Sequence, residues 1–323
     1  MNPPFEITSK ILNLVSQISE IVAILEHNEL QNIPIKLRKE NKIKTITGTL
    51  EIEGNTLGIE KITAIIEGKR VLGSIKEIEE VKGALRIYEN IDKIDYTKID
   101  DLLKAHKMLM GEILTKAGSW RSQNVGVGNS YEVSHIAPPF AQVPNLMYEL
   151  FEWLKKSDIH PLIKSSVFHY EFEFIHPFID GNGRIGRFWQ TLILYNWKNI
   201  FAFLPTESII RDSGKKYYKA IEDSSLSGNS TPFIEFMLEA ILKTCQKSLK
   251  DIKNVPKNDP LSVPKNRIDD ILQLIKRNSK ITIDEIANKL NVSSKTIKRD
   301  IAKLKEQNRL KRVGKKGGYW VVL

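Results

Sequence analysis

The sequence predicts a mainly α-helical body with one small β-hairpin, followed by a C-terminal winged helix domain. Apolar residues recur at three-to-four-residue spacing along most of residues 1–252, as they do on amphipathic helices. Three prolines with polar residues between them interrupt this pattern at 253–267, which is typical of a semi-extended linker. Beyond the linker, three short helical patterns and two β-forming segments follow in winged helix-turn-helix order.

The composition is that of an ordinary globular protein. Of 323 residues, 41% are hydrophobic and 27% charged, which favours neither disorder nor a membrane class. No apolar run reaches the roughly 20 residues of a membrane span, and the start lacks the pattern of a secretory signal. Cys245 stands alone, which fits a reducing compartment. We therefore expect a cytoplasmic protein with no membrane partner, in which Cys245 is a packing residue.

The net charge of +10 is concentrated at the C-terminal end. Residues 265–323 contain 16 Lys and Arg against 6 Asp and Glu, whereas the preceding residues carry 33 of each sign. This asymmetry indicates a polyanion-binding domain attached to a neutral body.

Residues 1–92 are predicted to form an N-terminal helical region. Its helical patterns cover 5–30, 59–66 and 74–91. After a basic run comes T-G-T-L-E-I-E-G-N-T-L at 47–57, whose alternation also fits a short strand. Two glycines in that stretch weaken a helical interpretation, so the local pattern leaves both options open.

Residues 93–252 are predicted to form the second part of the body. Thr97 is a suitable N-cap for its first helix. The segment 120–139 differs, because glycines flanked by β-forming residues and closed by Pro138 and Pro139 indicate a small hairpin. The remaining helical patterns cover residues 144–156, 161–175, 188–197, 207–224 and 232–249.

Residues 268–323 are predicted to form the winged helix-turn-helix. We expect helices over 268–276 and 283–290, and a third helix from Ser293 or Ser294 to Gln307. The last 14 residues, L-K-R-V-G-K-K-G-G-Y-W-V-V-L, indicate two short strands around a glycine turn.

The stretch H-P-F-I-D-G-N-G-R-I-G-R at 176–187 gathers groups suited to a triphosphate. Gly181 and Gly183 let the backbone approach phosphate oxygens without a Cβ clash. Arg184 and Arg187 are three residues apart, so on the first turn of a helix they share a face and can clamp successive phosphates.

Three further side chains complete the candidate site. Asn182 can donate an amide N–H to a phosphate oxygen, and Asp180 is suited to hold Mg²⁺ while phosphates supply other ligands. His176 is suited to act as a general base for an attacking hydroxyl at neutral pH. Each feature alone more often marks a turn, an ion pair or a structural histidine, but together, in this order, they are much more specific.

The same stretch matches the Fic motif H-x-F-x-[D/E]-G-N-G-R-x-x-R at every defined position, and the resemblance extends over roughly residues 2–249. It implies a Fic-type helical bundle with its catalytic domain at 93–252, which transfers AMP from ATP to a Ser, Thr or Tyr hydroxyl of a target protein and uses Mg²⁺. His176 would deprotonate that hydroxyl. The ATP-binding residues would be Glu53, Asp180, Gly181, Asn182, Gly183, Arg184, Ile185, Gly186, Arg187, Tyr217 and Tyr218, with Asp180 as the metal ligand.

Two details refine this resemblance. The Doc kinase-like branch carries a bulkier residue at the second glycine of G-N-G, so Gly183 favours AMP transfer. The predicted hairpin resembles the Fic flap, which aligns a target segment by strand addition. The flap residues over the substrate would be Val133, Ser134, His135 and Ile136. For the tyrosine pair at 217–218, core packing is an equal alternative to a place near the adenine and ribose.

The ambiguous stretch 47–57 also matches a family pattern. T-L-E-I-E-G-N at 49–55 resembles the inhibitory motif [S/T]-x-x-x-E-[G/N] of self-restrained Fic proteins, where it lies on a helix. The four-residue spacing would then place Thr49 and Glu53 on one face. The resemblance implies that Glu53 pairs with Arg187 and takes the space that the γ-phosphate needs.

The helix at 293–307 resembles the recognition helix of DeoR-like winged-helix proteins, notably in T-I-K-R-D-I. The residues that would face DNA are Lys295, Thr296, Lys298 and Arg299. Candidates for phosphate contacts in the wing are Lys311, Arg312, Lys315 and Lys316. Small domains of this kind also mediate protein contacts, and surplus lysines are often only a solvated surface.

The leading interpretation is an autoinhibited protein adenylyltransferase that uses ATP and Mg²⁺, binds DNA through its C-terminal domain and forms a homodimer. Its target would be an unidentified protein or the chain itself. Three alternatives stay open: a DNA-binding regulator whose body senses a nucleotide or protein without turnover, a bifunctional enzyme that also removes AMP, and transfer of another phosphate-bearing group.

Overall fold

The computed structural model describes residues 2–29, 35–128, 133–253, 267–290, 292–306, 309–314 and 318–322. The chain divides into two compact units, one comprising Met1–Leu30 and Arg38–Asn254 and the other Gln31–Leu37 and Val255–Leu323. The predicted domain limits at 92, 252 and 267 stay predictions, and the linker at 254–266 lies outside the described residues.

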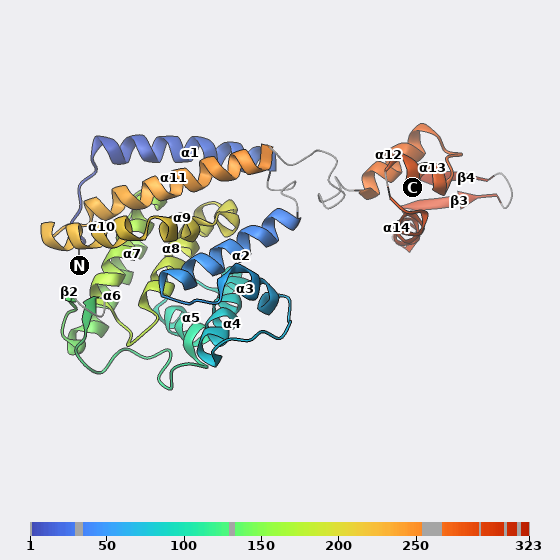
Figure 1. Ribbon diagram of the computed structural model, residues 1–323. Coiled ribbons are helices and arrows are strands. Elements are labelled where there is room, and N and C mark those ends of the chain that lie inside the picture. The colour runs from blue at the N-terminus through green and yellow to red at the C-terminus, as the bar shows by residue number, and fades with distance from the viewer. Residues whose placement is uncertain are drawn as a thin grey trace. The chain divides into compact units, whose positions relative to one another are not determined.

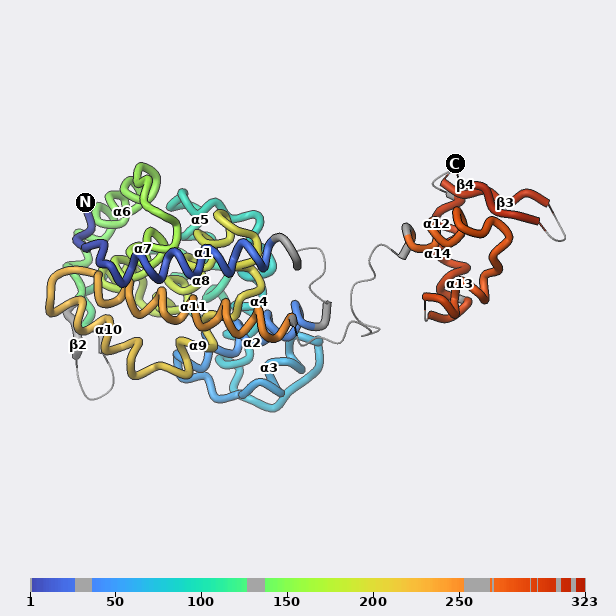
Figure 2. The backbone as a smooth tube through the Cα atoms, turned by 90° about the horizontal axis from the view of Figure 1, so that it is seen from above, coloured from blue at the N-terminus to red at the C-terminus, as the bar shows by residue number. Residues whose placement is uncertain are grey.

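The body is a bundle of helices that confirms the predicted mainly α architecture (Figure 1). Its helices are α1 (Ser9–Glu29), α2 (Ile35–Ile52), α3 (Gly58–Ile66), α4 (Ile75–Glu89), α5 (Ile99–Met110), α6 (Val143–Lys156), α7 (Pro161–Ile175), α8 (Asn182–Trp197), α9 (Thr206–Asp212), α10 (Gly214–Ser227) and α11 (Thr231–Lys253). Short 3-10 turns are η1 (Ile91–Lys93), η2 (Phe140–Gln142) and η3 (Asn199–Phe203). Helix α1 lies along α11 in both views (Figures 1 and 2). Among the described residues, no helix is both long and apolar enough to cross a membrane.

Helices α7 and α8 pack against each other and present the motif between them. Phe168 and Phe172 of α7 and Trp189 of α8 are fully buried, and the ring centroids of Phe168 and Trp189 lie 6.4 Å apart. Burying each such aromatic side chain contributes roughly 1.5–3 kcal/mol relative to leaving it exposed. The connection 176–187 is therefore held at both ends by packed helices.

The predicted hairpin is present as two short antiparallel strands. Strand β1 (Gly126–Gly128) pairs with β2 (Val133–Ile136), with Gly126 opposite Ile136 and an irregularity after Val127. Its tip at 129–132 and the side chains of 127–136 lie outside the described residues.

The second unit has the predicted order of a winged helix domain. It contains α12 (Arg267–Arg277), α13 (Ile283–Lys289), α14 (Ser294–Glu306) and the antiparallel pair β3 (Leu310–Val313) and β4 (Tyr319–Val322). Thr282 and Glu285 form a capping box at the start of α13, which satisfies N–H groups at the helix end. Its core is formed by Ile271, Leu272, Ile275, Ile281, Ile286, Ala287, Ile297, Ile301, Leu304, Leu310 and Trp320.

The strand option for 47–57 is wrong, because α2 runs through the basic run and continues to Ile52. Ile46 and Leu50, four residues apart, are fully buried on one face of this helix. Gly48 is explained by a close approach, since a Cβ there would lie 2.8 Å from the backbone of Glu207 in α9. The glycine that weakens a helical interpretation therefore serves helix packing.

Other predicted boundaries shift for local reasons. Thr97 does not cap α5, because its N–H and hydroxyl both donate to Asp95 Oδ1 and the N-cap is Lys98. The predicted helix at 207–224 is broken at Ser213 into α9 and α10. Cys245 is fully buried, as a packing residue should be.

Gly83 supplies a test of how α4 and α5 pack. A Cβ on Gly83 would lie 2.1 Å from the carbonyl oxygen of Leu109, so Gly83→Ala forces the two backbones apart. We expect a loss of about 1–3 kcal/mol in the free energy of unfolding, against the gain of roughly 0.5–1 kcal/mol that alanine ordinarily brings inside a helix. Gly214→Ala is the control, because no atom lies within 4 Å of its Cβ position. Urea unfolding measures both, and equal stability of the two variants would contradict the packing argument.

Candidate active site

The stretch 176–187 forms the loop between α7 and α8 and the first turn of α8. His176 follows the last residue of α7, adopts a left-handed conformation with φ 50°, and donates its N–H to the carbonyl of Phe172 at 3.0 Å. A non-glycine residue rarely takes this conformation, which costs on the order of 1–3 kcal/mol. The surrounding contacts must therefore hold His176 in place.

Arg121 provides part of that restraint. Its guanidinium donates to the carbonyl oxygens of His176 at 2.8 Å, Ile175 at 3.3 Å and Gln123 at 2.9 Å, and to that of Pro138. Ile175 and His176 end α7, so the cation lies at the negative end of the helix dipole. Arg121 thus ties the base of the hairpin to the loop. The sequence offers no signal that would distinguish it from other arginines.

His106 on α5 supports the loop from another side. Its Nδ1 accepts the N–H of Gly118 at 2.8 Å, so Nε2 carries the proton and donates to the carbonyl of Asp180 at 2.9 Å. The ring stacks on Phe178 with centroids 3.7 Å apart. Burial lowers the pKa of His106 to about 4, so the imidazole is neutral at pH 7, as this pair of hydrogen bonds requires.

The Asn182 side chain holds the loop, a role that the sequence did not predict. Its side-chain Oδ1 accepts the N–H of Phe178 and its Nδ2 donates to the carbonyl of Phe178, both at 2.9 Å. The amide therefore closes the loop on itself with one of the two N–H groups of Nδ2, and the donation to a phosphate oxygen stays a prediction. Only the buried position shows this, because the sequence does not reveal which way an asparagine points.

The first turn of α8 presents backbone donors. Gly181 is the N-cap with φ 85°. The first hydrogen bond of the helix runs from the N–H of Ile185 to the carbonyl of Gly181. The N–H groups of Asn182, Gly183 and Arg184 consequently have no partner inside the helix. Together with the positive end of the helix dipole they form an anion-binding position.

The structure brings Thr49, Glu53 and Arg187 together. Glu53 directly follows α2, and its Oε1 accepts from Nη2 of Arg187 at 2.6 Å. Thr49 on the last turn of α2 accepts from the same guanidinium through its hydroxyl at 3.0 Å and its carbonyl at 3.1 Å. Burial lowers the pKa of Arg187, but Glu53, Tyr217 and Glu173 together raise it above its ordinary value, with Glu53 first among them. The Arg187 side chain is 1% exposed and that of Glu53 is 28% exposed.

The carboxylate of Glu53 also covers the G-N-G backbone. A Cβ on Gly183 would lie 2.3 Å from Oε1 of Glu53. The carboxylate therefore stands against the part of the α8 N-terminus that is suited to an anion. The negative group that directly follows α2 thus lies beside the backbone donors of the first turn of α8.

Arg184 is held by two acidic residues. Its Nη2 bonds to Oδ1 of Asp180 at 3.1 Å, and its Nη1 bonds to Oε1 of Glu80 on α4 at 3.0 Å. The Asp180 side chain is 41% exposed, so the carboxylate has an open side for a Mg²⁺ ion. Within the described part of the chain, no group of three or more His, Cys, Asp or Glu residues could hold a metal. A Mg²⁺ ion at Asp180 would therefore depend on phosphate and water ligands.

The remaining predicted residues separate into two groups. Ile185 is fully buried, and a Cβ on Gly186 would meet Oε1 of Glu173 at 2.8 Å, so both serve the packing of α8 on α7. Tyr217 is 2% exposed and its hydroxyl lies 3.2 Å from Nε2 of His169, in agreement with core packing. Tyr218 is 54% exposed. Its hydroxyl donates to the carbonyl of Ile52, next to Glu53, at 3.4 Å.

A buried carboxyl group lies behind Arg187. Burial raises the pKa of Glu173 to about 8, with Arg187 lowering and Glu53 raising it. Burial also lowers the pKa of neighbouring His169 to about 3. At neutral pH both groups are largely neutral, which leaves Glu53 as the main counter-charge of Arg187.

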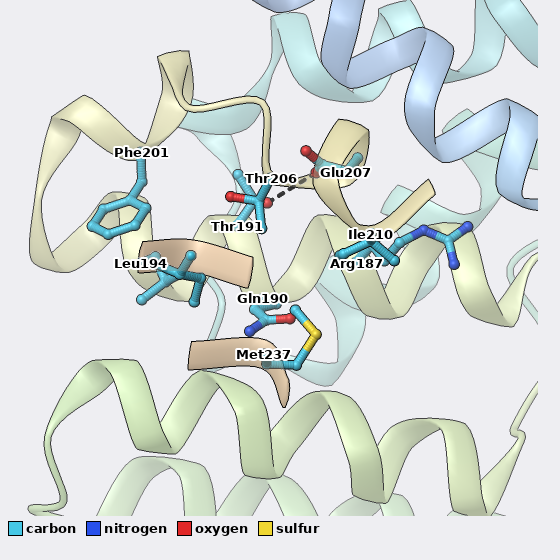
Figure 3. Close-up of a pocket in the computed structure, with 10 residues that line it drawn as sticks. Arg187, Gln190, Thr191, Leu194, Phe201, Thr206, Glu207, Ile210 and Met237 are labelled. Carbon is cyan, nitrogen blue, oxygen red and sulfur yellow. Dashed lines mark hydrogen bonds between the residues drawn. The ribbon is translucent and has the colours of Figure 1, made fainter. Parts of the chain in front are cut away.

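A small cavity lies beside Arg187, between α8, α9 and α11 (Figure 3). Thr191 and Glu207 line it, and Thr191 donates to Oε1 of Glu207 at 3.2 Å. Its volume of about 10 Å³ matches a single water, far below the roughly 300–1,000 Å³ of ligand pockets. This cavity is therefore not a nucleotide site.

The predicted DNA-facing residues lie on α14. Lys298 and Arg299 are exposed, Thr296 is half-buried and Ile297 packs inward. The side chain of Lys295 lies outside the described residues. In the wing, Lys311 and Arg312 are exposed, whereas 315–317 are not described.

Known proteins are similar to this chain in sequence and in fold. The Fic/DOC family model matches residues 96–194. A crystal structure of a Fic family protein from Desulfovibrio desulfuricans G20 superposes with a TM-score of 0.75 and 37% identity, covering 100% of this chain and 98% of that chain. The chain belongs to the Fic family. The DeoR-like helix-turn-helix model matches residues 267–321, in agreement with the predicted winged helix.

Other relatives match the body. Protein adenylyltransferase Fic of Drosophila melanogaster is 30% identical over 240 residues, which are 71% of this chain and 46% of that protein. The chain thus spans about half the length of the curated relatives it matches. Fic-1 (aa134–508) of C. elegans, at 23% identity, shares the fold alone with a TM-score of 0.61 over 76% of this chain and 73% of that chain.

Glu173 generates a pH prediction. Its pKa of about 8 in the folded protein lies above the ordinary 4.5, so the folded state retains a proton that the unfolded state releases between these values. This group therefore makes stability fall as pH rises from about 4.5 to 8. We expect Glu173→Gln to be more stable than the wild type at pH 8 by about 1–3 kcal/mol, with the difference shrinking at pH 5. Urea unfolding across this range measures it, with Glu222→Gln on the exposed face of α10 as control. A pH-independent difference would refute the assignment.

Proposed function

We propose that this protein transfers AMP from ATP to a hydroxyl side chain of a target protein. The observation that carries the proposal is the carboxylate of Glu53, bound to Arg187 against Gly183 at the N-terminus of α8. A buried arginine that already holds one carboxylate, beside helix N–H groups that have no partner inside the helix, is suited to the phosphates of ATP. The resemblance to Protein adenylyltransferase Fic supports the same reaction.

In this reaction the triphosphate lies along the first turn of α8, with Arg184 and Arg187 on successive phosphates. His176 takes the proton of the target hydroxyl while its oxygen forms a bond to the α-phosphorus. The bond from that phosphorus to the oxygen bridging to the β-phosphate breaks, and pyrophosphate leaves. A Mg²⁺ ion held by Asp180 would neutralise charge on the phosphates.

The same geometry supports autoinhibition by Glu53. Arg187 cannot bind the γ-phosphate while Glu53 and Thr49 occupy its guanidinium. Glu53 is the more exposed partner and directly follows the end of α2, so it can leave while Arg187 stays buried. The proposed resting state is therefore an active site closed by its own N-terminal helix.

Labelled ATP with Mg²⁺ tests both roles. We expect Glu53→Gly to increase self-labelling about tenfold or more, because the lost hydrogen bond to a charged group is worth roughly 1.5–3 kcal/mol. His176→Ala should abolish labelling in either background. Glu51→Gly is the matched control, because Glu51 also lies at the end of α2 but pairs with Arg211.

Equal labelling of the wild type and Glu53→Gly would contradict autoinhibition. No labelling by Glu53→Gly would favour the rival function, a sensor without turnover. The added mass on the modified chain, measured by mass spectrometry, distinguishes AMP from another phosphate-bearing group. Release of AMP from a labelled protein would reveal the bifunctional alternative.

The partners follow from the two units. The proposed target is a protein whose extended segment pairs with the hairpin strand β2, or a second copy of the chain in self-modification. A homodimer stays a prediction.

DNA is the proposed partner of the C-terminal unit, supported by its charge and by the exposed Lys298 and Arg299 on α14.

Duplex binding at increasing salt tests the DNA proposal. We expect affinity to fall steeply with salt concentration, because phosphate contacts release counterions. Replacing Lys298 and Arg299 together by Ala should weaken binding about tenfold or more and reduce the salt slope by about 2. The control replaces Lys276 and Arg277, exposed at the end of α12, by Ala. Salt-insensitive binding, or equal effects of the two double variants, would refute the proposal.

A further inference from the structure

Glu80 is a buried acidic residue outside the motif that contacts two functional segments at once. It lies on α4 and is 7% exposed. Its Oε1 accepts from Nη1 of Arg184 at 3.0 Å, and its Oε2 accepts from Nδ2 of Asn55 at 2.8 Å. The reaction proposed above uses Arg184 but assigns no role to Glu80 or Asn55.

Asn55 lies two residues after Glu53 and fixes the path of the chain there. It is 6% exposed, and its N–H donates to the carbonyl of Leu50 in α2 at 3.1 Å. Its side-chain Oδ1 accepts the N–H of Leu57 at 3.2 Å, while Nδ2 donates to Glu80 and to the carbonyl of Glu77 at 3.3 Å. The turn that carries Glu53 is therefore anchored on one side by α2 and on the other by α4, where Glu80 provides the shorter contact.

We propose that Glu80 is a positioning residue that holds Arg184 for phosphate binding and, through Asn55, holds Glu53 over Arg187. The Glu80 carboxylate thereby contacts Arg184 directly. It acts on Arg187 indirectly, through Asn55 and the turn that carries Glu53. This inference rests on the proposed function, because it assigns Glu80 and Asn55 a part in nucleotide binding and in its inhibition.

The charge of Arg184 explains why a second acidic partner is needed. Arg184 is 3% exposed, and a guanidinium in that position requires hydrogen-bonded counter-charge. Its other partner, Asp180, is the proposed ligand of Mg²⁺ and would share its charge with the metal. The Glu80 carboxylate binds neither the nucleotide nor the metal in this proposal, so its contact with Arg184 stays the same when they bind.

Two nearly isosteric substitutions separate these contacts. Glutamine at 80 has one acceptor oxygen for the two donors of Arg184 and Asn55, so Glu80→Gln loses at least one contact. Asn55→Asp keeps the acceptor for Leu57 but replaces the donor facing Glu80 by a second carboxylate oxygen. Like charges at this distance repel, so Asn55→Asp should release the turn that carries Glu53.

The experiment measures self-labelling and ATP binding in two backgrounds. Asn55→Asp should increase labelling about tenfold in the wild type and change it less than about twofold in Glu53→Gly, where the inhibitory group is already absent. Asn41→Asp is the control, because Asn41 is also buried on α2 and donates to the backbone carbonyl of Phe203. It should leave labelling unchanged.

Glu80→Gln is tested in the Glu53→Gly background. Because Arg184 contacts phosphate before and during the reaction, we expect KM for ATP to rise about tenfold with kcat changed less than about twofold. Calorimetry should show the same loss of ATP affinity without turnover. Glu80→Asp, which keeps two acceptors, should recover part of it.

Unchanged ATP affinity in Glu80→Gln, or equal labelling of Asn55→Asp and the wild type, would overturn the inference. An equal increase of labelling by Asn55→Asp in both backgrounds would also overturn it. If Glu53→Gly binds ATP but labels nothing, the proposed function fails. The calorimetric comparison of Glu80→Gln then still decides the positioning role.

Discussion

The buried charge of Arg187 is the constraint on which the rest of the site depends. A guanidinium with 1% side-chain exposure destabilises the fold unless acidic and hydrogen-bonding partners surround it. Glu173 and Glu207 lie near it, but burial raises the pKa of both. Glu53 is thus the main resting counter-charge. In the proposed function a phosphate that binds Arg187 replaces Glu53, so the proposed inhibition and substrate binding depend on the same buried cation.

Close backbone approaches make this exchange possible. Gly48 brings α2 against the start of α9, and Gly183 leaves room for the carboxylate of Glu53 over the first turn of α8. A side chain at either position would alter the distance between α2 and the motif. Arg121 and His106 restrain the loop from the hairpin and from α5. These contacts hold the loop in place, whereas in the proposed function the Glu53 side chain is the group that leaves.

The sequence identified the elements whose information is local. Residues 176–187 carry their base, carboxylate, glycines and arginines within 12 positions, so their order alone indicated the family and the site. Helical periodicity predicted most elements, because each amphipathic helix reports its own buried face. The order of helices and strands and the charge at the C-terminal end predicted the winged helix for the same reason. Local pattern failed at 47–52, where Gly48 weakens a helical interpretation, whereas Gly54 does lie in the turn after the helix.

Only the tertiary structure decided which distant residues support the site. Arg121, His106 and Glu80 meet the motif across 55, 74 and 104 positions of sequence, and nothing in their neighbourhoods distinguishes them. The close approach of Gly48 to α9, and the directions in which the side chains of Asn182 and Tyr217 point, are also visible only in the structure. These features arise from packing between helices that are far apart in the chain. A single sequence records the spacing along one helix but not the distance between two.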